Sequence, residues 1–180
     1  MMKHLLRASR AIDALNGAVG RAVRWLVLAA VLVSAVNALI RYAFSSSSNA
    51  WLELQWYLFG AIFLLGAGYT LKVNGHVRID LLSSRLSPRA RAWIDIVGAL
   101  FFLLPMTLII LYFSWPMFVD SFVTGEMSSD AGGLLRWPAK ALIPAGFGLL
   151  ALQGLSEIIK RAAFLRGFAP AAPAAETEPH

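Results

Sequence analysis

Four long apolar runs, separated by short polar or charged stretches, set the pattern of this chain of 180 residues. The most informative is the second, which is apolar from Trp56 to Leu71 and lies between Glu53 and Lys72. A charge-free stretch of about 18 residues is long enough to cross the hydrocarbon core of a bilayer as a helix. Because neither charged side chain is stable in that core, Glu53 and Lys72 mark the two interfaces. The pattern therefore predicts a membrane-spanning helix at about residues 52–72.

The other three apolar runs predict three further spans. Their approximate limits are residues 22–41, 92–117 and 137–160. The first run closes on Arg41-Tyr42, a pair typical of the membrane interface, which favours a span over a cleaved signal peptide. Pro105 lies inside the third run and predicts a kink, because proline removes a backbone donor that neighbouring helices can compensate.

The stretches between the spans are short and have their own patterns. Residues 1–24 are basic with apolar positions near helical spacing, which predicts a short interfacial helix leading into the membrane. Apolar side chains after the second span recur at three- to four-residue steps, which predicts a surface-lying amphipathic helix between spans two and three. These are Val77, Leu81, Leu82 and Leu86. Ser87-Pro88 is typical of a helix N-cap followed by proline in the first turn.

Composition places the chain in the membrane class. It is 58% hydrophobic and only 14% charged, where soluble domains carry about 25% charged residues. The prediction is an all-α integral membrane bundle of four helices forming one domain over residues 1–168. An Ala/Pro-rich tail at 169–180 is predicted to be disordered. The net charge of +6 does not indicate nucleic-acid binding, because the basic residues lie beside the ends of apolar runs.

The basic residues also predict the orientation. The N-terminal arm, the stretch between spans two and three and the C-terminal flank are basic, whereas the other two connections are neutral or acidic. Basic loops stay in the cytoplasm. A multi-pass membrane protein of four spans with both termini in the cytoplasm satisfies every connection.

The spans offer little chemistry of their own. The chain has no cysteine, its three histidines lie outside the spans, and its acidic residues lie near span ends. No phosphate-binding loop, metal-ligand spacing or nucleophile–base pair is present. The sequence therefore predicts no catalytic residue, no metal site and no cofactor, and disfavours an enzyme or an independent pump.

Small residues on the second span are candidates for helix contact. Gly60, Gly66 and Gly68 would let another backbone approach closely. The pattern alone leaves open whether that helix belongs to this bundle or to a partner.

Polar and aromatic residues at the start of the same span are further candidates. Trp51 and Trp56 are typical interface anchors. Glu53 is either a solvated acid at headgroup level or a partner of Arg41 across the short connection. Gln55 is costly to leave in lipid and favours a hydrogen bond between helices.

An ordered set of motifs resembles a known family, the small membrane (DctQ-type) subunit of tripartite ATP-independent periplasmic (TRAP) transporters. The resemblance covers roughly residues 22–162. The motifs are Arg41-Tyr42, Trp51-x-Glu53, Gly66, His76-Val77-Arg78-Ile79-Asp80, Leu86-Ser87-Pro88-Arg89, Ser114-Trp115-Pro116, Gly132-Gly133-Leu134 and Lys140-Ala141-Leu142-Ile143-Pro144. Many relatives carry a second glutamate directly after the first, whereas here Glu53 is followed by Leu54-Gln55.

The resemblance implies a location in the bacterial inner membrane and a division of labour among subunits. A periplasmic protein binds an organic acid, a large many-span subunit carries it inward with sodium, and the small subunit scaffolds the large one without binding substrate. The implied partners are the large subunit, in a stable heterodimer, the binding protein, transiently, and membrane lipid. His76, Arg78 and Asp80 join the candidate interface residues through this resemblance. Two alternatives stay open: an autonomous homo-oligomeric transporter or channel, and a membrane assembly factor.

Overall fold

The computed structural model describes residues 2–45, 48–74 and 86–168. Its helices are α1 (Met2–Phe44), α2 (Asn49–Lys72), α4 (Pro88–Gly98), the π-helix η1 (Ala99–Leu103), α5 (Leu104–Thr124) and α6 (Trp137–Leu165). Over the described ranges, four helices are long and apolar enough to cross a membrane, with α4, η1 and α5 continuous as one of them. The predicted fold class, an all-α bundle of four membrane helices, is confirmed. The predicted amphipathic helix falls mostly on residues 75–85, and it and the tail at 169–180 lie outside the described residues.

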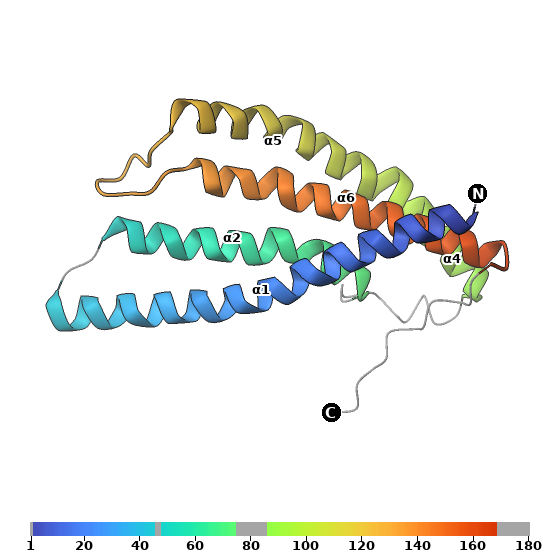
Figure 1. The fold of residues 1–180 in the computed structure, drawn as a ribbon, viewed down its shortest axis with the longest axis horizontal. Helices are drawn as coiled ribbons and strands as arrows, with labels where there is room; N and C mark the ends of the chain where they lie inside the picture. Colours follow the sequence, from blue (N-terminus) through green and yellow to red (C-terminus); the bar gives the residue numbers. More distant parts are fainter. Residues whose placement is uncertain (1, 46–47, 75–85, 169–180) are drawn as a thin grey trace.

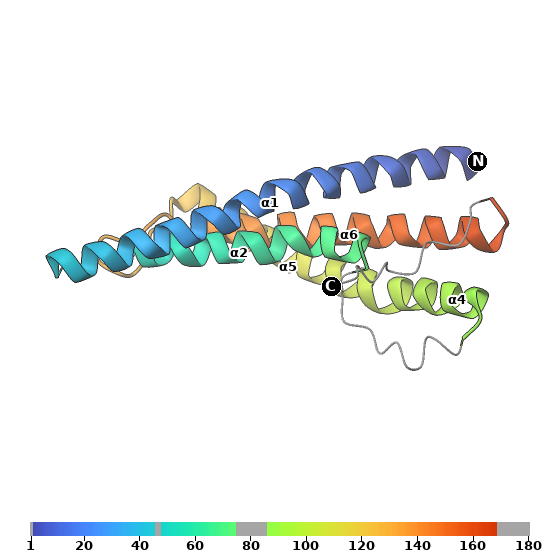
Figure 2. The same ribbon diagram turned by 90° about the horizontal axis from the view of Figure 1, so that it is seen from below.

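The helices run lengthwise beside one another, with α6 in the middle (Figure 1). Helix α6 contacts α1, α2, α4 and α5, and α2 also packs along α1. The connection between α1 and α2 and the loop 125–136 lie at one end of the bundle, which we call the loop end (Figure 1). The N-terminus lies at the opposite end, on the side of α6 away from α4 (Figures 1 and 2). We call this the N-terminal end.

Helix α1 is a single helix of 43 residues, so the prediction of a separate interfacial helix at 1–24 is wrong. At 1.5 Å per residue, α1 is about 65 Å long, well beyond the hydrocarbon core of about 30 Å. No proline interrupts it, and its glycines lie where α2 comes close rather than at a break. A Cβ on Gly20 would overlap the ring of Tyr69 in α2. The basic arm and the first span are therefore one rigid element.

The third span, where Pro105 predicts a kink, contains a π-helix that ends two residues before this proline. Proline lacks an N–H, and its ring clashes with the carbonyl four residues earlier, that of Phe101. The wider π-helical turn over Ala99–Leu103 lies where that clash would occur, and α5 begins at Leu104. The predicted cap is also present: Ser87 Oγ accepts from the backbone N–H of Ala90 at 3.3 Å, with Pro88 next in the chain.

Small side chains form the interior of the bundle. The buried apolar residues of the described ranges are Val23, Ala30, Ala61, Ala92 and Ala163. Large apolar side chains instead face outward, such as Phe63, Phe102 and Tyr112, each at least 74% exposed. Close helix packing through small residues with large residues outside is typical of membrane bundles.

Candidate functional site

The loop 125–136 folds back on itself at the loop end. Helix α5 stops at Gly125, whose left-handed backbone (φ 62°) suits glycine. Met127 and Leu135 then form an antiparallel bridge, and the N–H of Ser128 donates to the carbonyl of Leu134 at 2.9 Å. Gly132, with φ 73°, makes the turn between the two arms. The loop is therefore a short hairpin that delivers Leu134 to the start of α2.

Glu53 of α2 holds this hairpin. One carboxylate oxygen accepts from the backbone N–H of Leu134 at 2.6 Å, and the other accepts from the hydroxyl of Ser128. Gly133 lies between them without room for a side chain, because a Cβ would overlap Ser128 and lie 2.8 Å from Glu53 Oε1. We call Glu53, Ser128, Gly133 and Leu134 the loop clamp. Hydrogen bonds to a carboxylate are about twice as strong as neutral ones, so the clamp fixes the hairpin on α2.

Further contacts support the clamp on either side. From α2, the hydroxyl of Tyr57 donates to the carbonyl of Leu135, and the amide of Asn49 donates to that of Ala131, both at 3.0 Å. From α6, Lys140 pairs with Glu126. The hydrogen bond from the Lys140 ammonium holds the pKa of the Glu126 carboxyl below its usual range. The loop is thus tied to both neighbouring helices.

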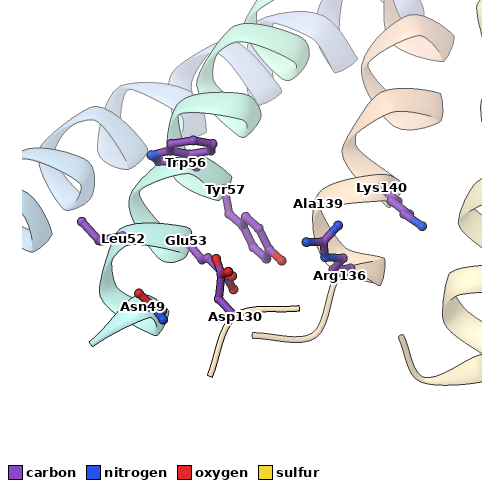
Figure 3. A pocket seen from close by; sticks show the side chains of 9 residues that line it. All are labelled: Asn49, Leu52, Glu53, Trp56, Tyr57, Asp130, Arg136, Ala139 and Lys140. Atoms are coloured by element: carbon purple, nitrogen blue, oxygen red, sulfur yellow. The ribbon is translucent and has the colours of Figure 1, made fainter. Parts of the chain in front are cut away.

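A pocket of about 420 Å³ lies between the start of α2, the hairpin and the start of α6. Figure 3 shows the nine residues that line it. The guanidinium of Arg136 points toward the hydroxyl end of Tyr57, whereas Lys140 points away from the pocket (Figure 3). Leu52 and Trp56 line the α2 side and are 41% and 76% exposed. The pocket is therefore lined by charged residues on one side and by an exposed apolar face of α2 on the other.

A second polar cluster joins α1 to α6 at the N-terminal end. Gln153, which is fully buried, accepts from Asn16 at 3.0 Å and donates to Asp13 at 2.8 Å and to Glu157 at 3.0 Å. The ammonium of Lys160 lies 3.2 Å from Asp13 and 2.5 Å from Glu157. The two carboxylates, Asp13 and Glu157, are thus paired with a cation that the protein itself supplies, the ammonium of Lys160.

Other contacts extend this cluster. The hydroxyl of Ser156 donates to Asp13 and lies 2.8 Å from the hydroxyl of Ser9. Lys72 at the end of α2 donates to the backbone carbonyl of Asp13 at 2.9 Å. We call Ser9, Asp13, Asn16, Gln153, Ser156, Glu157 and Lys160 the polar network. It ties α1 to α6 where the apolar part of the bundle ends, and the bond from Lys72 adds α2. In the described residues, no group of three or more His, Asp or Glu side chains is placed to bind a metal ion.

The predicted residues at the start of α2 have different surroundings. Glu53 bonds to the hairpin, and among the described residues no ion pair joins it to Arg41, which is exposed at the end of α1. The pairing predicted between them is absent because the hairpin engages both carboxylate oxygens. Trp51 is half-buried and Trp56 exposed, and the side-chain amide of Gln55 makes no hydrogen bond to another described residue. Of this group, the structure gives only Glu53 a specific polar role.

The predicted glycines also differ from one another. A Cβ on Gly68 would overlap the side chain of Asn16 and lie 3.3 Å from the carbonyl of Leu149, so it marks a close approach within this bundle. Gly60 and Gly66 have ordinary distances to their neighbours, with 3.9 Å and 3.8 Å to the nearest side-chain atoms. His76, Arg78 and Asp80 lie outside the described residues.

Comparison with known proteins places this arrangement in a family. Residues 30–164 match the model of the DctQ component of tripartite ATP-independent periplasmic transporters. The chain belongs to this family. It is therefore a small component of a TRAP transporter and a multi-pass membrane protein. No curated protein and no solved structure gives a significant match.

The polar network of this TRAP component is what sequence reasoning missed, although a signal was present. On α6, polar residues recur at helical spacing, at Gln153, Ser156, Glu157 and Lys160. On α1 the same spacing places Ser9, Asp13 and Asn16 on one face. Two polar stripes of this kind near the same end of a bundle indicate a contact between their helices. The stripe on α1 was not recognised as a helix contact, because the basic residues around it favoured a helix on the membrane surface.

Glu53→Ala in this TRAP component is expected to release the hairpin without unfolding the bundle. The N–H of Leu134 would lose a charged acceptor, a bond of about 1.5–3 kcal/mol, so its hydrogen exchange should speed up by about tenfold or more. Gly133→Ala should have the same effect from the other side of the clamp. Hydrogen–deuterium exchange of the peptide covering 126–136 measures both.

The matched control is Asp120→Ala, which removes an exposed carboxylate on α5. It should leave exchange of the hairpin unchanged. Equal protection of Leu134 in the parent and in Glu53→Ala would show that the clamp does not hold the loop.

Proposed function

We propose that this chain is the non-catalytic small subunit of a TRAP-type secondary transporter, and that it scaffolds the large transport subunit. The transporter would take up an organic acid with sodium, after capture by a periplasmic binding protein. Membership of the DctQ family supports the assembly with these two partners. The scaffold role rests on the structure of the bundle itself.

The observation that carries the scaffold role is that the charged groups of the polar network and of the loop clamp tie structural elements to one another. Translocation needs a site for the cargo or the coupling ion that opens to either side, built from polar groups or broken helices near the midplane. In the polar network, Lys160 already pairs with both Asp13 and Glu157. At the loop end, Glu53 is engaged by the hairpin. Both clusters lie toward the ends of the bundle and stabilise one arrangement of its helices.

The outer surface supports the same conclusion. Along η1 and α5, large apolar side chains face away from the bundle. Among them are Phe101, Phe102, Tyr112 and Phe113, which are 66% to 75% exposed. Such a surface suits lipid tails and the helices of a larger membrane partner, and it offers no polar path for an ion.

Reconstitution tests the proposal directly. The purified small subunit in liposomes is expected to show no sodium-driven uptake of organic acids. Activity should appear only when the large subunit and the binding protein are added. Uptake by the small subunit alone would refute the scaffold role and favour an autonomous transporter. Normal uptake by the large subunit without this chain would instead favour an assembly factor.

The proposed orientation places both termini in the cytoplasm and the loop end in the periplasm. It is supported by the basic residues Arg7, Arg10 and Arg21, which are exposed on the N-terminal half of α1. The chain lacks cysteine, so single cysteines report cleanly. Cysteines replacing the exposed Ser48 and Ser129 should react in intact spheroplasts with a membrane-impermeant thiol reagent. One replacing Ala8 should react only after lysis, and its labelling in intact spheroplasts would reverse the orientation.

A further inference from the structure

The pocket at the loop end contains charged groups of both signs whose hydrogen-bonding capacity is largely unused. Four charged residues line it: Glu53, Asp130, Arg136 and Lys140. Two of these are already engaged, because Glu53 holds the hairpin and Lys140 pairs with Glu126. Among the described residues, the carboxylate of Asp130 makes no hydrogen bond or ion pair, and the guanidinium of Arg136 makes only a long bond of 3.4 Å to Ser129. Arg136 also interacts electrostatically with Glu53 and Glu126, but most of its N–H donors have no hydrogen-bond partner among the described residues. The pocket is thus lined by one carboxylate and one guanidinium that can still form hydrogen bonds.

An apolar stripe leaves the pocket along the outside of α2. It consists of Leu52, Trp56, Phe59 and Phe63, at helical steps of four, three and four residues, with exposures between 41% and 78%. At 1.5 Å per residue it extends about 16 Å, which is half the hydrocarbon thickness of about 30 Å. A stripe of this length, which starts at Leu52 and includes the interfacial Trp56, matches an acyl chain in one leaflet.

We propose that this pocket binds a zwitterionic phospholipid whose head group carries a primary ammonium, as in phosphatidylethanolamine. The guanidinium of Arg136 would bind the phosphate, since arginine presents several donors in a geometry suited to phosphate oxygens. The carboxylate of Asp130 would accept from the ammonium. One acyl chain would lie along the stripe from Leu52 to Phe63. A small head group that carries both charges fits the carboxylate of Asp130 and the guanidinium of Arg136 better than a purely anionic head group does.

The test is lipid binding by the purified full-length protein. Native mass spectrometry in a mild detergent would compare phosphatidylethanolamine, phosphatidylcholine and phosphatidylglycerol with identical acyl chains at equal concentration. Phosphatidylethanolamine should bind most tightly, because phosphatidylcholine has no ammonium hydrogen to donate and phosphatidylglycerol has no cation. Equal binding of the three would overturn the proposal, and preference for phosphatidylglycerol would replace it by a site for an anionic lipid.

Two variants separate the two charges. Arg136→Gln should weaken both phosphatidylethanolamine and phosphatidylglycerol by about tenfold, through loss of a charge-assisted bond to phosphate. Asp130→Asn should weaken phosphatidylethanolamine alone. The matched controls are Arg41→Gln and Asp120→Asn, which remove exposed charges that do not line the pocket. Unchanged thermal unfolding without added lipid would show that the variants fold, and unchanged lipid preference in both would overturn the assignment.

Discussion

Gly146→Leu is expected to destabilise the bundle by about 3 kcal/mol or more and to remove the protein from the membrane, because the new side chain has nowhere to go. A Cβ on Gly146 would lie 2.7 Å from the carbonyl oxygen of Leu64 and 2.8 Å from its carbonyl carbon. These are backbone atoms of α2, so a rotamer change cannot relieve the overlap. Helices α2 and α6 would have to separate along their contact. The midpoint of thermal unfolding in detergent and the protein level in the membrane measure the effect.

Gly148→Leu is the matched control, two residues further along the same helix. A Cβ there would meet nothing within 4 Å. Both substitutions gain the same helix propensity, about 1 kcal/mol per residue in favour of leucine over glycine, so their difference isolates the contact with α2. Similar stability of the two variants would show that α2 and α6 are not in close contact at Gly146.

Hydropathy was sufficient to predict the four spans, because each has to be long enough and apolar enough by itself. It could not predict how far the helices continue beyond the membrane. Helix α1 extends back to Met2, and its first half packs on α6 through Asp13 and Asn16. Such an extension is stabilised by contacts with a distant segment, which a local pattern does not contain.

The glycines show the same limit. Gly60, Gly66 and Gly68 are equivalent in a small-residue motif, but only Gly68 has no room for a side chain. The difference depends on the partner helix, because Asn16 of α1 and Leu149 of α6 both approach Gly68. The tightest contact with α2 backbone comes from Gly146, which no motif singled out. Whether a glycine is needed is therefore a property of a pair of helices.

The two span glutamines differ for a related reason. Gln55 follows Glu53 at the start of α2, where sequence reasoning gave it a hydrogen bond between helices. In the structure it is half-buried, and its side-chain amide has no hydrogen-bond partner among the described residues. Gln153, which drew no attention, is fully buried at the centre of the polar network. The two side chains are chemically identical, and they differ only in what the facing helix places beside them.

Gln153→Leu is accordingly expected to cost about 2 kcal/mol of stability, whereas Gln55→Leu should cost close to nothing. Leucine has nearly the volume of glutamine but no polar atoms, so the change at Gln153 removes bonds to Asn16, Asp13 and Glu157 without opening a large cavity. Asp13 and Glu157 would still form ion pairs with Lys160. Most of the lost stability therefore comes from the buried side-chain amide of Asn16, which would no longer have Gln153 Oε1 as an acceptor. Hydrogen bonds between membrane helices are worth about 0.6 kcal/mol each, and up to about 1.7, which sets the scale of the loss.

Thermal unfolding of the two variants in the same detergent measures the difference. Equal midpoints would show that the polar network adds nothing to the contact between α1 and α6.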